Sequence, residues 1–553
     1  MKTSRLFLLS ALLVAVAPLR AQEASPPASV PAVEAVASGH APTELAKIAA
    51  GAAEESTDTT VAKTEEASAS WLDALDKKVG AVDDWVWGPT LIGAILVTGI
   101  ILTCILRFVH LFNLKRAFRY TFVTESDGHG EVSSFGALCT ALSATIGTGN
   151  IVGVATAIGT GGPGALFWME VAAFFGMATK YAEGLLAVKY REIAPDGSVL
   201  GGPFYYIEKG LGKNWKWLAI LFAVFGTIAG IMGIGTITQI QGISSAADRF
   251  FKLCVYKGAA APTIHLFGTD YSMVVAITGL VVTVCAGLVL IGGLKRIASV
   301  STVVVPFMAI FYVLICAFLL LGNLSKVTAA LELIVKAAFN PKAFTGGMVG
   351  TIFIAIQKGV ARGIFSNEAG LGSAPIAAAA AKTNEPVRQG LVCMTGTFID
   401  TIIICTMTGL SIVVTGAWQP ELGLKGVDIT IEAFSKGLGF LPHADFIGPL
   451  FLSVALAFFA FTTILGWDYY SEKCLEYLVG RKNKAVLMVY RVLYVLVVFM
   501  GPYLTVAVVW DTADVFNGLM AFPNLIALIL LSPTVGRLTR DYFRRLKAGE
   551  ISE

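Results

Sequence analysis

Residues 362–375 read RGIFSNEAGLGSAP, a polar and glycine-rich stretch inside an otherwise apolar run. Residues 144–151 read ATIGTGNI and interrupt a second apolar run in the same way. Such a break leaves backbone N–H and C=O groups without helical partners, which a membrane tolerates only where the break is buried in protein or lines a cavity. The two stretches therefore predict a pair of discontinuous transmembrane helices. For either break alone, a kink with small-residue packing is the alternative.

The composition of the whole chain is typical of a polytopic membrane protein. Its 553 residues are 56% hydrophobic and 14% charged, with a mean hydropathy of +0.73, whereas soluble domains carry about 25% charged residues. Several apolar runs exceed the roughly 20 residues that cross a bilayer. These values exclude a soluble enzyme, a nucleic-acid-binding protein and a disulfide-stapled module. The net charge of +3 indicates no electrostatic partner beyond the bilayer.

The first 86 residues predict an exported leader. Residues 1–21 begin with a basic region of Lys2 and Arg5, followed by a short apolar run and an imperfect cleavage site, which is the pattern of a signal peptide. An uncleaved amphipathic stub is the alternative. Residues 22–86 are predicted to be an exported low-complexity segment that ends in an amphipathic stretch at the membrane interface.

Hydropathy predicts an all-α transporter domain over 87–540, followed by a cytoplasmic tail over 541–553. The eleven predicted transmembrane helices are 88–113, 133–158, 163–190, 216–248, 270–291, 297–321, 345–371, 387–416, 445–478, 485–509 and 514–535. With an exported N-terminus, the inward-facing segments carry 21 Lys and Arg and the outer loops carry 8. This distribution obeys the positive-inside rule. It predicts a bacterial plasma (inner) membrane protein with the N-terminus outside and the C-terminus in the cytoplasm.

The two breaks occupy corresponding places in the chain. The first opens a block of five spans over 133–321, and the second opens another block of five over 345–535. The blocks run in opposite directions across the membrane. Two five-helix blocks of opposite topology, each starting with a broken helix, indicate an inverted-repeat transporter. The span over 88–113 is then one extra leading helix.

These motifs also carry a family resemblance. Together with FFGMATKYAE at 174–183 and Gly466-Trp467, the two breaks resemble the alanine or glycine:cation symporter family over about residues 80–540. The resemblance implies a leucine-transporter-like five-plus-five fold. It also implies sodium-coupled uptake of alanine, glycine or another small neutral amino acid, with sodium as the co-transported ligand and no further cofactor. No enzyme is predicted, because the chain lacks HExxH and any GxSxG motif with a membrane histidine.

An amino acid zwitterion needs a partner for each of its charges. The N–H groups at the start of the second half of a broken helix, with the positive end of its dipole, suit a carboxylate. The carbonyl ends of the first halves suit the ammonium group. The resemblance implies substrate contacts at Thr148, Gly149, Gln239, Phe365, Ser366 and Asn367. Gln241 is the fallback for Gln239, and interhelical hydrogen bonding for Gln239 and ordinary packing for Phe365 are the alternatives.

Sodium requires oxygen ligands, which a helix break and hydroxyl side chains supply. The resemblance implies a sodium site formed by the side chains of Thr462 and Thr463 and by carbonyl groups near Ser143, Ile146 and Phe459. Hydrogen bonds from the two threonines to their own helix are the alternative. Asn150 is a candidate for a second sodium site through its side-chain oxygen.

Charged residues inside the spans leave several roles open. Lys180 and Glu183 form an inner gate pair or a snorkelling pair. Glu368 caps backbone N–H groups of its break or pairs with Arg362. A proton-coupled amino acid transporter on the same fold is the alternative function, with three buried acids as proton carriers: Glu170, Glu368 and Asp400. The span over 297–321 contains no Lys or Arg that could replace sodium, which favours sodium.

Overall fold

The computed structural model describes residues 66–123, 128–195, 197–266, 269–339, 352–504 and 507–551. The predicted signal peptide, the exported segment up to residue 65 and the first residues of the span predicted over 345–371 lie outside these ranges. The described part is all-α apart from two short antiparallel hairpins. The prediction of an all-α polytopic membrane protein is therefore confirmed.

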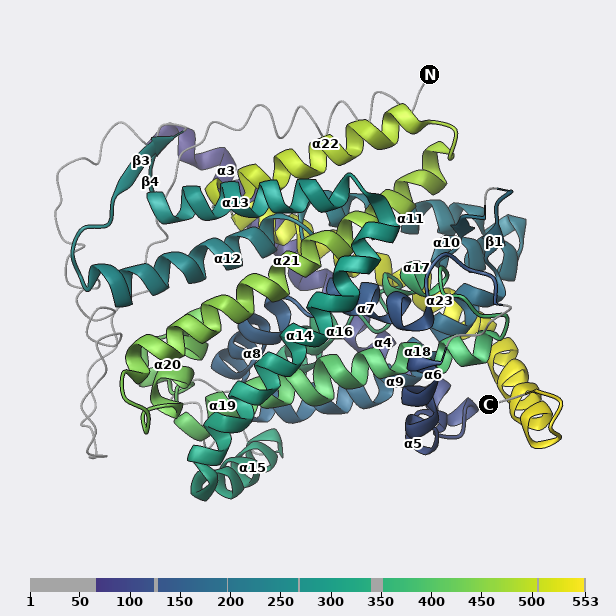
Figure 1. Ribbon diagram of the computed structural model, residues 1–553, viewed down its shortest axis with the longest axis horizontal. Helices are drawn as coiled ribbons and strands as arrows, with labels where there is room; N and C mark the ends of the chain where they lie inside the picture. Colours follow the sequence, from purple (N-terminus) through teal and green to yellow (C-terminus); the bar gives the residue numbers. More distant parts are fainter. Residues whose placement is uncertain are drawn as a thin grey trace.

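Many of the longer helices run roughly along the long axis of the molecule, with other helices between them and at their ends (Figure 1). The helices are α3 (Glu66–Val86), α4 (Pro89–Ile105), α5 (Val109–Phe112), α6 (Leu114–Phe122), α7 (Ser134–Thr145), α8 (Val154–Gly161), α9 (Gly164–Lys189), α10 (Pro203–Tyr206), α11 (Lys216–Met232), α12 (Ile237–Phe250), α13 (Met273–Leu290), α14 (Gly293–Gly322), α15 (Leu324–Phe339), α16 (Ile352–Asn367), α17 (Ala374–Ala378), α18 (Pro386–Thr397), α19 (Thr406–Thr415), α20 (Val427–Gly437), α21 (Ala444–Val479), α22 (Lys484–Met500) and α23 (Ala507–Lys547).

Shorter elements complete the chain. The π-helical segments are η1 (Gly149–Gly153), η2 (Ile207–Leu211), η4 (Phe251–Tyr256) and η6 (Phe398–Cys405), and the 3₁₀ turns are η3 (Lys213–Trp215), η7 (Pro420–Leu422) and η8 (Gly501–Tyr503). The hairpins are β1 (Glu192–Ile193) with β2 (Val199–Leu200), and β3 (Thr263–Leu266) with β4 (Thr269–Ser272).

Nine helices of the described part are long and apolar enough to cross a membrane, and ten if the bent pair of α7 with η1–α8 is one span. The prediction of eleven spans is thus met in part. The span predicted over 345–371 is the difference. Within the described residues it consists of α16, which covers 16 residues and ends at the break after Asn367.

Both predicted breaks are present. The helix pair Ser134–Thr145 and Gly149–Gly161 is bent by 54° at the first break. At the second break, the chain leaves helical geometry between α16 and α17. Positive φ angles at Glu368 (56°), Gly370 (92°) and Gly372 (86°) account for this change of direction. Positive φ is costly for a residue with a side chain, so Glu368 must be held by its surroundings.

The span predicted over 216–248 is confirmed as one candidate crossing, Lys213–Tyr256, and a third break interrupts its helix. Helix α11 ends at Met232 and α12 begins at Ile237. A Cβ atom at Gly233 would collide with Ala513, and one at Gly235 would collide with Trp467. The interruption therefore depends on glycines that let α21 and α23 approach the backbone closely.

Other differences concern the loops and the span ends. Helices α15 and α20 form where only loops were expected, because short amphipathic helices lack the long apolar run that hydropathy detects. Helix α22 ends at Met500, short of the predicted residue 509. Helix α23 continues to Lys547, beyond the predicted end at 535, so the expected tail starts inside this helix.

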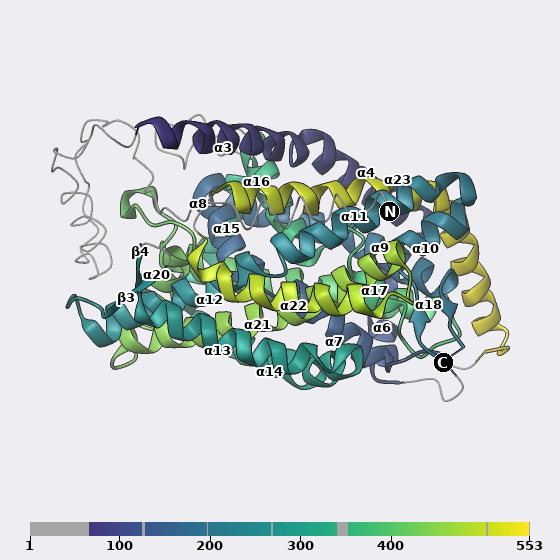
Figure 2. The ribbon, with the colours of Figure 1, turned by 90° about the horizontal axis from the view of Figure 1, so that it is seen from above.

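The two ends of the bundle differ in what they carry. One end holds β1, α6, α10 and the C-terminal residues, and the opposite end holds β3, β4 and α20 (Figures 1 and 2). The first group comes from segments predicted to face the cytoplasm, so it is called the inner end below.

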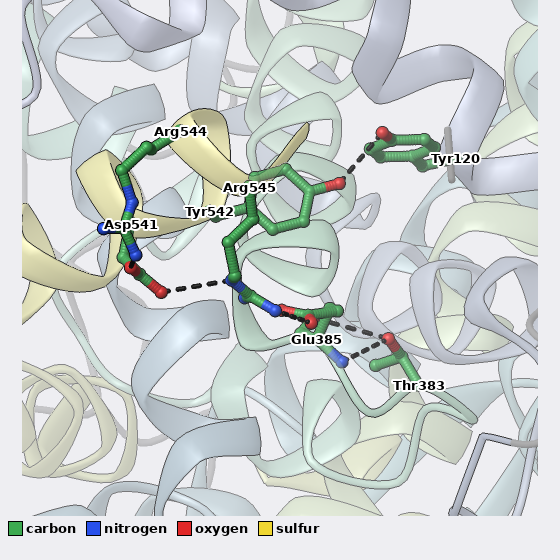
Figure 3. Close-up of polar contacts among 7 residues, drawn as sticks. All are labelled: Tyr120, Thr383, Glu385, Asp541, Tyr542, Arg544 and Arg545. Carbon is green, nitrogen blue, oxygen red and sulfur yellow. Dashed lines mark hydrogen bonds and ion pairs between the residues drawn. The ribbon is translucent and has the colours of Figure 1, made fainter. Parts of the chain in front are cut away.

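The end of α23 is tied to its neighbours at the inner end (Figure 3). The Arg545 guanidinium donates two hydrogen bonds of 2.8 Å to the Glu385 carboxylate, just before α18. The Tyr542 hydroxyl donates to the hydroxyl of Tyr120 on α6 at 2.9 Å. These contacts fasten three segments that are distant in the sequence.

Candidate functional site

Side chains satisfy the backbone groups that the first break sets free. The Gly147 N–H donates to Asn150 Oδ1 at 2.9 Å, and the Thr148 N–H donates to Gln239 Oε1 at 3.1 Å. The Gln239 amide in turn donates to the Ile234 carbonyl, in the break between α11 and α12, at 2.9 Å. Gln239 thus connects the first break to the third. Asn150 uses its side-chain oxygen as a cap.

The second break is satisfied in the same way. The Gly370 N–H donates to Glu183 Oε1 at 3.1 Å, and its carbonyl accepts from Asn524 Nδ2 at 2.9 Å. Asn524 also donates to Glu183 at 2.7 Å. The Ala369 N–H donates to Asn367 Oδ1 at 2.9 Å. These buried contacts meet the requirement that non-helical backbone in a membrane be fully hydrogen-bonded.

The two breaks face each other at the predicted substrate residues. A Cβ atom placed on Gly149 would lie 3.2 Å from Ser366 Cα and 3.3 Å from Phe365 Cδ1. Thr148, Gln239, Ser366 and Asn367 are all buried, and Phe365 is half-buried. The structure therefore brings the predicted substrate residues together at one place. Gln241 lies elsewhere, because its amide donates to the Gly501 carbonyl at 3.2 Å.

Asp400 joins the two broken helices. Its Oδ1 accepts from Asn150 Nδ2 at 2.8 Å, and its Oδ2 accepts from the Ser366 hydroxyl at 2.8 Å and the Thr401 hydroxyl at 2.7 Å. Thr401 also accepts from Asn367 Nδ2 at 3.0 Å. From the sequence, Asp400 is predicted to be a buried acid and a candidate proton carrier. A carboxylate in an apolar run indicates that some polar group lies next to it. That Asp400 contacts both breaks is shown only by the tertiary structure.

The residues predicted to bind sodium meet where α21 crosses the first break. The Thr463 hydroxyl lies 3.2 Å from the Ile146 carbonyl oxygen and 3.1 Å from the Phe459 carbonyl oxygen. The Thr462 hydroxyl donates to the same Phe459 carbonyl at 2.9 Å. Both threonines therefore bond back to their own helix, and Thr463 also reaches across to the break.

Ser143 lies near the end of α7, close to the first break. Its hydroxyl donates to the Thr140 carbonyl at 2.7 Å, within α7. The predicted contribution of Ser143 is through its carbonyl group, so this hydroxyl contact leaves the prediction open. The Asn150 oxygen, suggested for a second sodium site, accepts the Gly147 N–H.

The charged residues predicted as gate or structural groups fall into two places. Glu368 accepts from Trp467 Nε1 at 2.8 Å and from the Ser373 hydroxyl. Arg362 lies over the Phe365 ring at 5.6 Å from its centroid and is 3.9 Å from Asp514. The structure thus favours the structural role of Glu368, with Trp467 and Ser373 as partners in place of Arg362.

Lys180 and Glu183 lie deep in the protein, with 3% and 0% of their surfaces exposed. The Lys180 ammonium group interacts electrostatically with both Glu183 and Glu368. This burial argues against a snorkelling pair, which would place the charged end of the lysine in water. The two residues instead support the second break from α9.

A pocket of about 650 Å³ lies at the inner end, away from the breaks. It is lined by α10, η2 and the end of α21, and most of its charged groups are paired. Lys473 contacts Glu476 at 2.7 Å, and Lys216 contacts Glu208 at 3.0 Å. Burial acts to raise the pKa of Glu208, but hydrogen bonds from Tyr477 and Lys216 hold that pKa below its usual value. The ion pairs at this pocket therefore connect neighbouring segments of the chain.

The fold and the site together define a class of protein. A bundle of membrane helices in which two helices are broken, and in which the buried polar groups of the two breaks face each other, is the arrangement of a transporter. The chain belongs to the Sodium:alanine symporter family, whose sequence pattern matches residues 72–553. It is a multi-pass membrane transporter of a sodium-coupled amino acid symporter family, and not an enzyme.

Individual relatives align with this chain over nearly their whole length. A protein named as an uncharacterized transporter of Haemophilus influenzae is 51% identical over 481 residues, which is 87% of this chain and 98% of that protein. The sodium/alanine symporter AgcS of Methanococcus maripaludis is 45% identical over 470 residues, 84% of this chain and 96% of that protein. The probable sodium/glutamine symporter GlnT of Bacillus subtilis is 37% identical over 477 residues, 86% and 92% of the two chains.

Proposed function

We propose that this protein takes up alanine, glycine or another small neutral amino acid together with sodium, by alternating access across the bacterial plasma membrane. The observation that carries the proposal is the contact between the Thr463 hydroxyl on α21 and the Ile146 carbonyl at the first break. It brings a hydroxyl from one five-helix block to a freed carbonyl of the other. Hydroxyl and carbonyl oxygens at a helix break are the ligands that sodium uses in transporters of this kind.

The proposed sodium site consists of the Thr462 and Thr463 hydroxyls and the carbonyl groups of Ile146, Phe459 and Ser143. A bound ion replaces hydrogen bonds that the two threonines now make to carbonyl oxygens. Since Ile146 caps the end of α7, sodium binding there fixes the direction in which the chain enters the break.

The proposed amino acid site lies between Thr148-Gly149 on one break and Phe365-Ser366-Asn367 on the other. The substrate carboxylate binds the N–H groups at the start of η1, where the helix dipole is positive. The Thr148 N–H now donates to Gln239 Oε1, so the carboxylate takes the place of that oxygen. The narrow gap between Gly149 and Phe365 supports a small side chain.

The proposed cycle couples the two ligands through the first break. Sodium orders the end of α7, and this pre-organises the N–H groups that bind the carboxylate. Each ligand then raises the affinity for the other by the same factor. The inner halves of the two broken helices, α7 and α17, move apart to release both ligands to the cytoplasm, where the C-terminus is also proposed to lie.

The test is uptake of labelled alanine and glycine into proteoliposomes with imposed sodium or proton gradients. Sodium-driven uptake of either amino acid supports the proposal. Uptake driven by a proton gradient and insensitive to sodium contradicts the ion assignment. No uptake of either amino acid under any gradient contradicts the substrate assignment.

A proton-coupled transporter is the second candidate, and Glu170 on α9 favours it. Both of its carboxylate oxygens are buried, with the Thr406 side chain as a polar neighbour. An ionised carboxylate in such a place costs several kcal/mol, so Glu170 is expected to carry a proton. Uptake driven by a proton gradient and lost in Glu170→Gln would support this candidate, whereas unchanged sodium-driven uptake in that variant supports sodium alone.

A further inference from the structure

The inner ends of the two broken helices are fastened to each other. Residues 129–132 lead into α7, and residues 380–384 follow α17. The Glu131 N–H donates to the Ala380 carbonyl at 2.8 Å, and the Lys382 N–H donates to the Val132 carbonyl at 2.8 Å. Val132 and Ala381 form a parallel β-bridge. The two segments are thus joined by backbone hydrogen bonds, as adjacent strands are.

A single guanidinium group spans this junction. Arg191, which follows α9, donates from Nη1 to the carbonyls of Ala379 (2.6 Å) and Ala381 (2.7 Å). From Nη2 it donates to the carbonyls of His129 and Thr383, both at 2.6 Å. One side chain therefore holds both segments from a third element.

The approach of the two segments is as close as their backbones allow. A Cβ atom at Gly130, which has a φ of 152°, would collide with the Ala381 carbonyl. A Cβ atom at Gly201 would collide with Ala379 and lie 3.2 Å from Arg191 Cβ. Glycine at these positions lets the junction close beneath Arg191.

The junction lies where water can reach it. His129 is exposed and Arg191 is half-buried. Directly beneath it, Ala378 packs with Ala187 and Val199 and is 1% exposed. Breaking the junction would therefore expose a buried layer. It would not place the guanidinium group in an apolar environment, because water can replace the four carbonyl acceptors.

We propose that Arg191 is the inner gate residue of this transporter. Its guanidinium holds α7 and α17 together while the substrate site is closed to the cytoplasm, and it releases their carbonyl groups each time the site opens inward. The proposal rests on the proposed function, since only alternating access requires the junction to open. Lysine cannot replace arginine here, because an ammonium group lacks the planar fork that reaches four acceptors at once.

The experiment measures access to the layer beneath the junction. A reporter Ala378→Cys is introduced into a protein whose eight native cysteines are replaced, and a membrane-impermeant maleimide is applied to inside-out vesicles. We expect Arg191→Gln to raise the labelling rate by about tenfold or more, as a shift toward the inward-open state requires. Arg191→Lys should give a smaller increase. Lys189→Gln, the same charge change at an exposed side chain two residues away, should have no effect.

Two further variants separate gating from a loss of folding. Gly130→Ala should act like Arg191→Gln, because it wedges the same junction from the other side. A scaffold reporter, Ala223→Cys, is fully buried on α11 and should stay protected in every variant. Labelling at both reporters would show general unfolding and would overturn the gate assignment.

The outcomes also separate this proposal from the proposed function. Unchanged labelling at Ala378→Cys in both Arg191→Gln and Gly130→Ala overturns the gate, even if the native protein shows sodium-driven uptake. Absence of sodium-driven uptake by the native protein overturns the proposed function, whatever the labelling shows.

Discussion

The Thr463 hydroxyl on α21 lies 3.2 Å from the Ile146 carbonyl oxygen at the end of α7. This contact joins α21 to the first broken helix, at the end of α7. Its two oxygens belong to residues separated by 317 positions in the sequence. The first prediction therefore concerns this pair.

Thr463→Ala should raise the sodium concentration for half-maximal uptake by about tenfold or more, because a lost contact to a charged group costs about 1.5–3 kcal/mol. Thr463→Ser keeps the hydroxyl and should stay close to the native value. The control is Thr415→Ala, since the Thr415 hydroxyl bonds only within α19 in the contacts described. A sodium dependence that is the same in Thr463→Ala and the native protein would remove this residue from the ion site.

Gly147→Ala should abolish uptake while the protein still folds. The added Cβ would lie 2.5 Å from Thr463 Oγ1 and 3.0 Å from Gln239 Oε1, so it would disturb the proposed sodium and substrate sites together. Gly153→Ala is the matched control, since a Cβ there meets nothing within 4 Å. Uptake assays with size-exclusion profiles of both variants make the comparison. Normal transport by Gly147→Ala would mean that the closeness of the break to Thr463 has no functional role.

Asp400→Asn should lower the thermal stability of the purified protein by several degrees. The carboxylate accepts hydrogen bonds from Asn150, Ser366 and Thr401. In the amide, one of the two oxygens becomes an NH₂ group, which would face these donors and could not accept their hydrogen bonds. Each buried polar group left without a partner costs about 1–3 kcal/mol. Thermal unfolding in detergent, followed by tryptophan fluorescence, measures the shift.

The control for Asp400→Asn is Glu332→Gln, which removes an exposed carboxylate paired with Lys336 on α15. Exposed pairs of this kind contribute about 0–1 kcal/mol, so its transition should hardly move. Equal shifts in the two variants would show that Asp400 does not link the broken helices.

Glu385→Gln should reduce stability only slightly, by about 1 kcal/mol or less, because partly exposed ion pairs are screened by water and salt. The Arg545 and Glu385 side chains are 28% and 23% exposed, and their contact is visible in Figure 3. The charge-reversed double variant Glu385→Arg/Arg545→Glu should recover part of the loss at low salt. Thermal unfolding at low and high salt tests this, and a loss unaffected by salt would contradict an electrostatic origin.

Apolar run lengths and glycine-rich motifs were sufficient to predict an all-α membrane protein with two broken helices. The motif at 362–375 and its counterpart at 144–151 mark the breaks directly, because no membrane helix accommodates such polar glycine-rich stretches without a structural reason. The same motifs led to the family. They also gave Thr148, Gly149, Ser366 and Asn367, which the structure brings together.

The break between α11 and α12 was less visible in the sequence. Gly233 and Gly235 lie in a run that stays apolar throughout, so hydropathy shows one continuous span. The need for glycine there comes from Trp467 and Ala513, which pack against this backbone from distant parts of the chain. The sequence pattern of one helix does not indicate which distant residues pack against it.

By itself the sequence determined which segments enter the membrane and where two of them break, because these properties follow from local hydropathy and local backbone chemistry. Only the tertiary structure decided which side chains close the breaks. Asp400 reaches Asn150 and Ser366, and Arg191 reaches carbonyls in the segments next to both inner half-helices. Hydrogen bonds between residues tens to hundreds of positions apart depend on how helices cross, and no periodicity along the chain encodes that geometry.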